Sequence, residues 1–281
     1  MGLRAVVDLL RCPHCAGALM LADGTAGCDQ GHRFDVARQG YLNLLPGDAV
    51  TATADTAAMV DARSRFLDAG HYTPVTTAIT AALAQAAGPG AVIDVGAGTG
   101  HHLAAALDVL PDRVGVALDL SRHAARRAAR AHPRIGAVVC DAWQPLPLRD
   151  AAAGAVLCAF APRDAAEIAR VLAPGGALVL VTPTQQHLQE LIGPLGLVTV
   201  DPRKQERLAA QLTGFHAEKP PTTCATVMAL HHSDLAALAG MGPSAHHTDP
   251  AQLADAIAAL PQPMAVTASV SVAVMRPRNR C

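Results

Sequence analysis

The sequence predicts an α/β protein: a doubly wound, Rossmann-like sheet with a small metal-binding finger at its N-terminus. Three observations support this fold class. From Ala91 onward, short aliphatic segments alternate with alanine-rich helical segments, which is typical of a parallel sheet covered by helices. A glycine-rich turn, Gly96–Gly100, directly follows the first of these aliphatic segments. Within the first 32 positions, four cysteine and histidine residues have the spacing of a zinc site.

The finger is predicted from the pattern C-x2-C…C-x3-H, in which a twelve-residue loop separates two short knuckles. Tetrahedral zinc takes four sulfur or nitrogen ligands, and two such knuckles supply them. The candidate metal ligands are Cys12, Cys15, Cys28 and His32. We expect Leu19–Leu21 and Arg33–Asp35 to pair as a hairpin over the metal. The alternatives are a chance arrangement among 7 cysteines and 13 histidines, and a disulfide, which nothing else in the chain favours.

The composition limits the classes of function. Of the 281 residues, 51% are hydrophobic but only 2% are aromatic, so small aliphatic side chains build the core. The net charge of −1 excludes a global cationic field that would draw the protein to nucleic acid, and any RNA binding must use local patches. The sequence opens on no signal-peptide pattern and contains no apolar run of about 18 residues. We therefore expect a cytoplasmic protein that does not enter a membrane.

A linker and two helices are expected between the finger and the sheet. Residues 46–58 are rich in Gly, Ala, Thr and Asp, which is typical of a linker. One helix is predicted over Thr56–Asp68, with Gly70 after its end, and a second over Val75–Ala87, with Gly88 after its end. The predicted domains are a finger over 1–45, a linker and helical segment over 46–88, and the sheet domain over 89–281.

The sheet domain is predicted from five aliphatic segments and the helices between them. Strands are expected at Ala91–Val95, Arg113–Leu118, Ile135–Cys140, Ala155–Phe160 and Ala177–Thr182. Helices are expected at His101–Leu110, from Ser121 as cap to Ala131, and at Asp164–Leu172. The later part is predicted to form a helix over Gln185–Ile192, a strand over Leu195–Val200, a helix over Lys204–Leu212, and an antiparallel closing pair at Thr222–Leu230 and Ala265–Met275.

The glycine-rich turn lies between a strand and a helix and is a candidate ligand site. Its glycines let the backbone approach a ligand closely, and the helix N-terminus behind it favours polar groups. Four residues of the turn are candidate contacts: Gly96, Gly98, Thr99 and Gly100. A dinucleotide fingerprint would need a further glycine where this chain has His101. The turn therefore does not favour a nicotinamide or flavin cofactor.

Carboxylates lie at the ends of three successive strands, and each suits one part of S-adenosylmethionine. Asp94 lies beside the turn, where it would repel a pyrophosphate but would bind the ammonium of an amino acid. Asp119 ends the second strand and is placed to accept both ribose hydroxyls. Asp141 follows the third strand and could bind the adenine amino group. The set favours a sulfonium methyl donor, which carries no phosphate.

With the finger added to this domain, the chain resembles the bacterial 23S rRNA guanine-N1 methyltransferases, the RlmA/TlrB family, and within it the branch linked to tylosin and mycinamicin resistance. The segments that carry the resemblance are Cys12–Cys15, Gly31–Leu45, Phe66–Pro74, Asp94–Gly100, Phe160–Arg163, Leu172–Gly176, His187–Leu191, Asp201–Lys204 and Met241–His247. The match covers nearly the whole chain.

The resemblance implies a class I S-adenosylmethionine-dependent methyltransferase fold, with Cys12, Cys15, Cys28 and His32 as zinc ligands. It places donor contacts on Tyr72, on the Gly100–His101 turn and on His187. The implied reaction is methylation of guanine N1 in a 23S rRNA hairpin loop in domain II, near the peptide exit tunnel, which gives macrolide resistance. The implied partner is 23S rRNA, and a homodimer is left open.

The catalytic base is not identified by the sequence. Guanine N1 carries a proton that must leave, and the weak candidates to accept it are Asp141, His187, His246 and His247. Each also has a non-catalytic interpretation. Asp141 could be an adenine ligand, His187 a helix cap or a wall of the donor site, and His246 and His247 part of a surface loop. The sulfonium of the methyl donor could itself make methyl transfer feasible, so that the enzyme would only need to position the guanine.

Substrate binding is predicted on the finger and the helix after it. The arginines there are Arg11, Arg33, Arg38, Arg63 and Arg65, which could engage phosphates or simply be solvated surface residues. Phe34 and Tyr41 could stack on unpaired bases or seal a small core. Two other classes of function are open: a small-molecule O-methyltransferase acting on a polyketide or sugar, and a non-catalytic RNA-binding adaptor.

Overall fold

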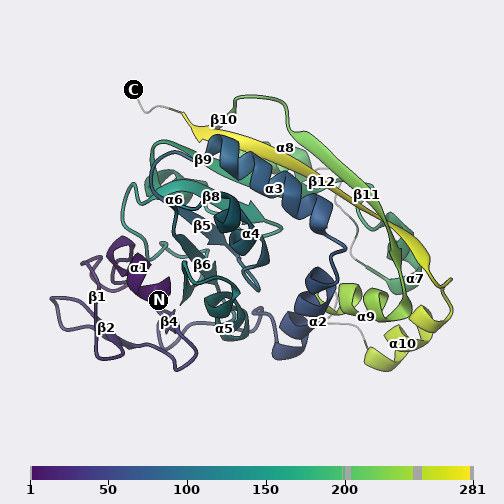
Figure 1. Cartoon of the computed structure of the whole chain (residues 1–281), viewed down its shortest axis with the longest axis horizontal. Helices are drawn as coiled ribbons and strands as arrows, with labels where there is room; N and C mark the ends of the chain where they lie inside the picture. Colours follow the sequence, from purple (N-terminus) through teal and green to yellow (C-terminus); the bar gives the residue numbers. More distant parts are fainter. Residues whose placement is uncertain (1, 198, 200–203, 243–248, 279–281) are drawn as a thin grey trace.

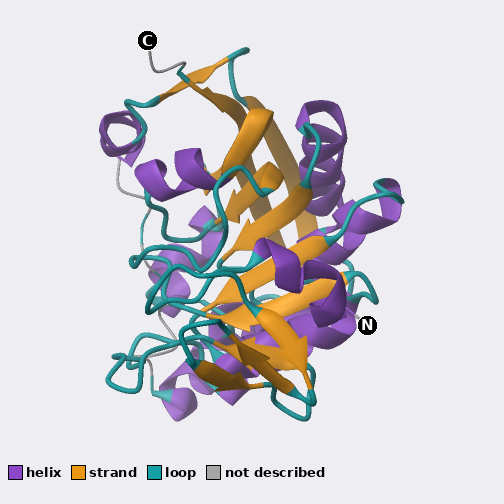
Figure 2. Cartoon of the chain, turned by 90° about the vertical axis from the view of Figure 1, so that its left-hand side faces the viewer, coloured by secondary structure: helices purple, strands orange, loops and turns teal. Residues whose placement is uncertain are grey.

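The structure is a computed structural model of the chain and describes residues 2–197, 199, 204–242 and 249–278. Within these residues, a nine-stranded mixed sheet with helices on both faces forms the body of the molecule, and a three-stranded sheet lies near the N-terminus (Figures 1 and 2). This architecture confirms the predicted α/β class with its N-terminal finger.

The centre of the large sheet is parallel, as the alternating pattern predicts. Its strands run in the order β7-β6-β5-β8-β9, and their bounds are Ile135–Val139, Gly115–Asp119, Ala91–Val95, Ala153–Ala159 and Leu172–Pro183. The connecting helices are α4 (His101–Val109), α5 (Arg122–Ala131) and α6 (Ala165–Val171). Because β5 and β7 are buried on both faces, they consist almost entirely of small aliphatic residues. The order reverses at β5, so a crevice is expected where β5 and β8 end.

Antiparallel strands complete one edge of the sheet. β12 (Met264–Pro277) pairs with β9, and β11 (Thr222–Leu230) pairs with β12. The predicted closing pair is confirmed. A short strand, β10 (Phe215–Ala217), pairs with the end of β12 beyond β11. At the opposite edge, β4 (Tyr41–Asn43) lies parallel to β7 and was not predicted.

The hairpin predicted in the finger is wrong in its pairing. β1 (Met20–Ala22) and β3 (Arg33–Asp35) belong to one sheet, but β2 (Thr25–Gly27) lies between them and pairs with both. The residues before this sheet form α1 (Gly2–Val6), which packs on β7, and a short 3-10 helix, η1 (Val7–Leu9). The finger is therefore joined to the large sheet by α1 on one side and β4 on the other (Figure 1). The division at residues 45 and 88 stays a prediction.

The two helices before the sheet are close to their predicted positions. α2 (Ala57–Asp68) begins at Thr56, whose hydroxyl accepts a hydrogen bond from the Met59 backbone N–H. α3 (Thr73–Ala86) packs across β9 and β12 and covers one face of the sheet. α2 packs against α9 (His232–Gly240), which the sequence analysis missed, as it missed α10 (Pro250–Ala258).

The segment after β9 differs from the prediction. The helix expected from Gln185 begins later, as α7 (Gln189–Leu195), because the backbone at Thr184 and Leu188 instead donates hydrogen bonds to β12. The strand expected from Leu195 therefore begins on a helical residue, and part of it lies outside the described residues. α8 (Lys204–Gln211) matches the predicted helix. In the described ranges, no helix is long and apolar enough to cross a membrane.

Candidate active site and metal centre

A cavity of about 910 Å³ opens where β5, β6, β7 and β8 end. It is lined by most of the residues that the sequence singled out as donor contacts: Tyr72, Asp94, Gly96, Gly98, Thr99, His101, Asp119, Asp141 and His187. Gly100 is the exception, because it lies behind the turn, close to α5. His246 and His247 lie outside the described residues. Parallel strands bring their carboxyl ends to one edge, so three carboxylates far apart in the sequence share one cavity.

The glycine-rich turn requires glycine for two reasons. Gly96 and Gly100 both have left-handed φ values, +71° and +76°, which side chains with a Cβ rarely adopt. The space is also limited, because a Cβ on Gly96 would lie 2.5 Å from the Cβ of Ala161. A Cβ on Gly100 would lie 3.0 Å from the Cα of Ala128. The turn is thus held between the β8 loop and α5, with its backbone exposed to the cavity.

Asp119 ties the turn to the end of β6. Its Oδ2 accepts a hydrogen bond of 2.8 Å from the Gly98 N–H, and its Oδ1 accepts one of 2.8 Å from the Ser121 N–H. Burial raises the pKa of this carboxyl, although both hydrogen bonds act in the other direction. A carboxylate offers about four acceptor positions, so two are left for the hydroxyls of a ribose.

Asp94 is the most deeply buried acid of the cavity, with 3% of its surface exposed. Burial, and then the nearby charge of Asp119, raise its pKa to about 8. A carboxylate in this position gains most from a cationic partner, which suits an ammonium group. Asp141 lies nearer the rim, where its Oδ1 accepts a hydrogen bond of 2.9 Å from the N–H of the exposed Trp143.

Tyr72 and His187 form a pair in the opposite wall. His187 Nδ1 accepts the Ser269 backbone N–H at 3.1 Å, so in the neutral ring the proton is on Nε2, which lies 3.3 Å from the Tyr72 hydroxyl. Burial raises the pKa of Tyr72, so the phenol keeps its proton. The Phe160 ring stacks on the imidazole at a centroid distance of 5.7 Å. Because both ring nitrogens of His187 are engaged, this geometry disfavours it as a general base.

Sequence reasoning missed two cavity residues and misplaced a third. His102 lies beside the predicted His101, and its Nδ1 is 3.1 Å from the Thr76 hydroxyl. Burial lowers the pKa of His102 to about 3 and also lowers that of His101, so both rings are neutral. Arg163 follows β8 and also lines the cavity. It belongs to the segment Phe160–Arg163, which carries part of the family resemblance, but sequence reasoning assigned it no role.

Arg63 is the residue that was misplaced, because it was expected either to engage RNA phosphates or to be a solvated surface residue. Its guanidinium forms an ion pair with Asp55 and donates a hydrogen bond of 2.9 Å to the Met241 carbonyl. It also lies beside the turn, since a Cβ on Gly98 would be 3.1 Å from Arg63 Nη1. Arg63 is thus part of the cavity wall.

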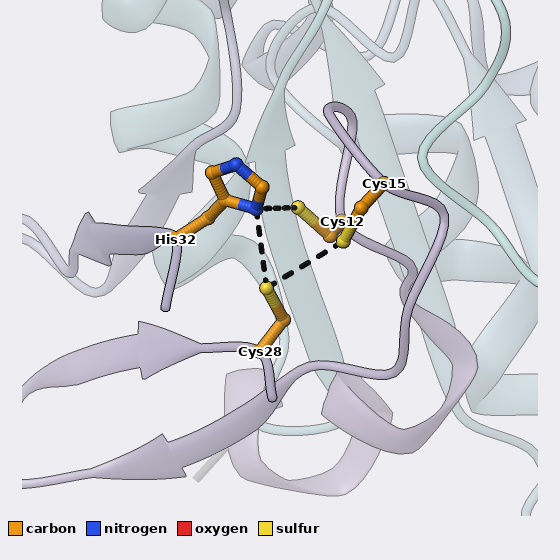
Figure 3. A group of neighbouring side chains, drawn as sticks. All are labelled: Cys12, Cys15, Cys28 and His32. Carbon is orange, nitrogen blue, oxygen red and sulfur yellow. Dashed lines mark hydrogen bonds between the residues drawn. The ribbon is translucent and has the colours of Figure 1, made fainter. Parts of the chain in front are cut away.

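The predicted metal ligands lie together in the finger (Figure 3). His32 Nδ1 is 3.6 Å from Cys12 Sγ and 3.4 Å from Cys28 Sγ, and Cys15 Sγ is 3.6 Å from Cys28 Sγ. A zinc tetrahedron with bonds of about 2.3 Å to sulfur and 2.0–2.1 Å to nitrogen has edges of about 3.8 Å between sulfurs and about 3.6 Å from sulfur to nitrogen. The four side chains therefore fit Zn²⁺. With four protein ligands such a site is closed and structural, not catalytic.

Ion pairs attach the first knuckle to the large sheet. Arg11 lies 3.6 Å from Glu167, which also forms an ion pair of 2.7 Å with Arg170. Arg170 in turn pairs with Asp150 at 2.7 Å, and Arg11 donates a hydrogen bond to the Leu146 carbonyl. Arg11 was also counted among the phosphate-binding arginines, but the structure uses it to fix the finger to the loop between β7 and β8.

Comparison with known proteins then identifies the family. Residues 10–49 match the family model of the RlmA N-terminal zinc ribbon, and residues 92–176 match a methyltransferase domain. A 23S rRNA (guanine(748)-N(1))-methyltransferase from Streptomyces fradiae is 50% identical over 97% of this chain and 98% of its own length. The chain belongs to the 23S rRNA (guanine-N1)-methyltransferase family. A relative from Micromonospora griseorubida, named for the same activity, is 49% identical over 95% of this chain and 97% of its own length.

The cofactors follow from the family and the geometry together. S-adenosylmethionine is the methyl donor, and Zn²⁺ is the metal of the finger. Among solved structures, a SAM-dependent methyltransferase from Geobacter sulfurreducens in complex with S-adenosyl-L-homocysteine is 15% identical, covers 72% of this chain and 90% of its own, and has a TM-score of 0.44.

Proposed function

We propose that this enzyme methylates N1 of a guanine in a hairpin loop of 23S rRNA, in domain II near the peptide exit tunnel. The main observation in support of the proposal is that the zinc finger is attached to the sheet that forms the donor cavity. The finger continues into the sheet through β4, and its first knuckle is fixed beside the loop after β7. A base held against the finger would therefore have a defined position relative to the donor.

In the proposed donor complex, each polar group of the cavity holds one part of the molecule. The Asp94 carboxylate would hold the ammonium of the methionine moiety, Asp119 the ribose hydroxyls and Asp141 the adenine amino group. Thr99 and the backbone of the Gly96–Gly98 turn would lie against the donor. When bound, S-adenosylmethionine supplies an electrophilic methyl group on a sulfonium. Tyr72 and His187, fixed by their mutual hydrogen bond, would hold the opposite side of the cavity and keep water from it.

The proposed RNA surface is narrower than the sequence suggested. Arg33, Arg38 and Arg65 are exposed and available to phosphates. Phe34 stacks on His14 of the first knuckle, at a centroid distance of 5.8 Å, which supports the interpretation that it seals the finger. The exposed aromatic rings at the cavity are instead Trp143 and Phe160, with 63% and 45% of their surfaces exposed. Unpaired bases beside the target guanine could stack there.

We further propose that the modification gives resistance to macrolides of the tylosin and mycinamicin type, and that the enzyme acts in the cytoplasm on ribosomal RNA. A methyl group on N1 adds bulk and removes a hydrogen-bond donor from the Watson–Crick edge of the guanine. Either change would weaken a drug that contacts this base.

Primer extension on rRNA tests the proposal, because a methyl group on N1 blocks Watson–Crick pairing and stops reverse transcriptase. We expect a stop at one guanine of a domain II hairpin in cells that carry the gene, and none in cells that carry the Gly98→Arg variant. The same two strains should differ in their growth on tylosin. A stop elsewhere in the rRNA, or none, would contradict the proposed substrate.

The alternative small-molecule O-methyltransferase needs a separate test. Deleting residues 1–45 is unsuitable, because β4 and α1 pack on the large sheet and their loss would damage the whole fold. Cys15→Ser is the better variant, since Cys15 is exposed and only the metal site should change. If the variant kept full transfer to a polyketide or sugar hydroxyl and the wild-type enzyme modified no RNA, the O-methyltransferase would be favoured.

A further inference from the structure

Arg163 is a cation in the cavity wall that the proposed donor complex does not use. It follows β8 in the segment Phe160–Arg163, next to the strand that carries Asp94. Its Nη1 donates a hydrogen bond of 3.2 Å to the Ala161 carbonyl. Its Nε is enclosed, and within the described part of the chain this atom has no hydrogen-bond partner.

The charge of Arg163 is also uncompensated by any ion pair with a carboxylate of the described residues. The adjacent Asp164 is engaged elsewhere, because its Oδ1 accepts the N–H groups of Ala166 and Glu167 at the start of α6. The guanidinium lies close to the Cys158 thiol of β8. Burial raises the pKa of this thiol to about 11, whereas the charge of Arg163 and a hydrogen bond with its side chain act to lower it, and the charge of Asp94 acts to raise it.

A guanidinium in a cavity wall that has no carboxylate partner among the described residues costs free energy, so its retention there indicates a ligand that supplies hydrogen-bond acceptors to it. The ligand must offer hydrogen-bond acceptors and tolerate, or use, a positive charge. Guanine offers such a pair of acceptors at O6 and N7, and the bidentate contact of arginine with these two atoms is the commonest base-specific contact in nucleic-acid recognition. This contact leaves the opposite edge of the base, including N1, open to the methyl donor.

We propose that Arg163 is a catalytic residue that binds O6 and N7 of the target guanine and assists the loss of its N1 proton. This inference rests on the proposed function. The N1–H bond breaks and the proton passes to solvent, leaving negative charge shared between N1 and O6. The N1 electron pair then forms the bond to the methyl carbon as the carbon–sulfur bond breaks, and that electron pair stays on sulfur as a neutral thioether. The guanidinium at O6 stabilises the anion before transfer.

The test compares wild-type enzyme with Arg163→Gln and Arg163→Lys in single-turnover methylation of a domain II hairpin transcript between pH 6.5 and 9.5. We expect Arg163→Gln to slow transfer about 10- to 100-fold at pH 7. We also expect the pH at which the methylation rate levels off to be higher for Arg163→Gln than for the wild type, by about one unit or more. The reason is that the N1 proton is lost less readily without the guanidinium. Arg163→Lys should restore the pH dependence in part, since it keeps the charge but not the planar fork.

A substrate with 7-deazaguanine at the target position separates recognition from a structural effect. It should slow the wild-type enzyme about tenfold and Arg163→Gln no further, because the variant has already lost the N7 contact. Arg122→Gln, on the exposed face of α5, is the matched control and should behave as wild type. Calorimetry with S-adenosylmethionine checks each variant, and Arg163→Gln should bind the donor normally.

The outcomes distinguish this inference from the function on which it rests. If wild-type enzyme transfers no methyl group to the guanine transcript, the proposed function fails. If it does, but Arg163→Gln has an unchanged pH profile and 7-deazaguanine slows both enzymes equally, only the role of Arg163 is refuted. If Arg163→Gln fails to fold, two other measurements test the role of Arg163: the effect of 7-deazaguanine on the wild-type rate and the pH profile of Arg163→Lys. If 7-deazaguanine does not slow the wild-type enzyme, the proposed contact is refuted.

Discussion

Replacing Asp94 with asparagine tests the assignment of this buried carboxylate to the donor ammonium. The folded-state pKa of about 8 is raised above the ordinary value of 3.8, mainly by burial. The stability that this acid contributes is therefore complete below pH 3.8 and is lost as the pH rises through about 8. At neutral pH the free protein has already lost part of this stability, and replacing the carboxyl group with an uncharged isostere avoids the loss.

The structure limits the size of the effect. Each pH unit between 3.8 and 7 corresponds to about 1.4 kcal/mol, so the cost at pH 7 is at most about 4 kcal/mol. Asparagine keeps a buried polar amide, which has its own desolvation cost. We therefore expect Asp94→Asn to raise the free energy of unfolding of the free enzyme by about 1–2 kcal/mol, and its melting temperature by about 2–6 °C. The exposed Asp112→Asn is the matched control and should change neither.

Donor binding should change in the opposite direction. Loss of one charge-assisted hydrogen bond should weaken S-adenosylmethionine about 10- to 100-fold. Because Asp94 is mostly protonated at pH 7 in the free enzyme, the donor must displace that proton. Calorimetry in two buffers of different ionisation enthalpy should count nearly one proton released by the wild type and none by Asp94→Asn. A less stable variant, or equal proton release by both proteins, would refute the reasoning.

Three further predictions follow from the finger, the turn and the ion pairs between them. Cys15→Ser should lower the zinc content measured by atomic absorption and reduce rRNA methylation, while calorimetry shows donor affinity nearly unchanged; equal loss of both would contradict a separate RNA-binding role for the finger. Gly98→Arg should abolish donor binding but keep the zinc, because the new side chain would enter the space of Arg63; retained turnover would show that the donor lies elsewhere. Glu167→Gln should destabilise the protein by about 1–3 kcal/mol in urea unfolding at pH 7, because Arg11 and Arg170 each lose one charged partner and keep only Asp150, and by much less at pH 3.

The pH dependence of Glu167 has a defined sign. Burial alone would raise its pKa, but hydrogen bonds from Arg170 and from the Leu146 N–H hold it below the ordinary 4.5. A carboxyl whose folded pKa is lowered contributes stability above its ordinary pKa and loses it as the pH falls through the folded value. The difference between wild type and Glu167→Gln should therefore fade below about pH 4.5. A constant difference down to pH 3 would show that the substitution acts through packing instead.

The sequence predicted well those elements whose signal is local. β5 was placed to the residue, because a five-residue segment with four aliphatic side chains ends at a glycine turn, and α5 was placed by the Ser121 cap. The strands of the finger were harder to predict. β2 carries no hydrophobic alternation, so the sequence predicts a direct pairing of Leu19–Leu21 with Arg33–Asp35. β4 has only three residues and pairs with β7, nearly 100 positions away, and no local pattern reports such a contact.

The same distinction applies to the candidate site. The three acids were predicted to meet because each lies at the carboxyl end of a parallel strand, and these ends share one edge of the sheet. Arg63 and Arg163 lie on a helix before the sheet and on a loop after β8, and their place in the cavity depends on how those elements pack. Arg63 was consequently assigned to the RNA surface, although it forms an ion pair with Asp55 beside the turn. The spacing of residues along the sequence does not show which side chains become neighbours when separate elements pack together.

The segment between β7 and β8 connects the metal centre to the donor cavity. At its start, Asp141 and Trp143 line the cavity. A few residues later, Pro145 and Pro147 lie against the first zinc knuckle, and the Pro147 carbonyl accepts the Arg11 N–H at 3.1 Å. The two prolines restrict this short connection, so a shift of the knuckle would be transmitted to the adenine end of the cavity. Zinc therefore positions the rim of the proposed donor site as well as the fold of the finger. Losing it should impair RNA positioning, while the deeper contacts at Asp94 and Asp119 keep donor affinity nearly unchanged.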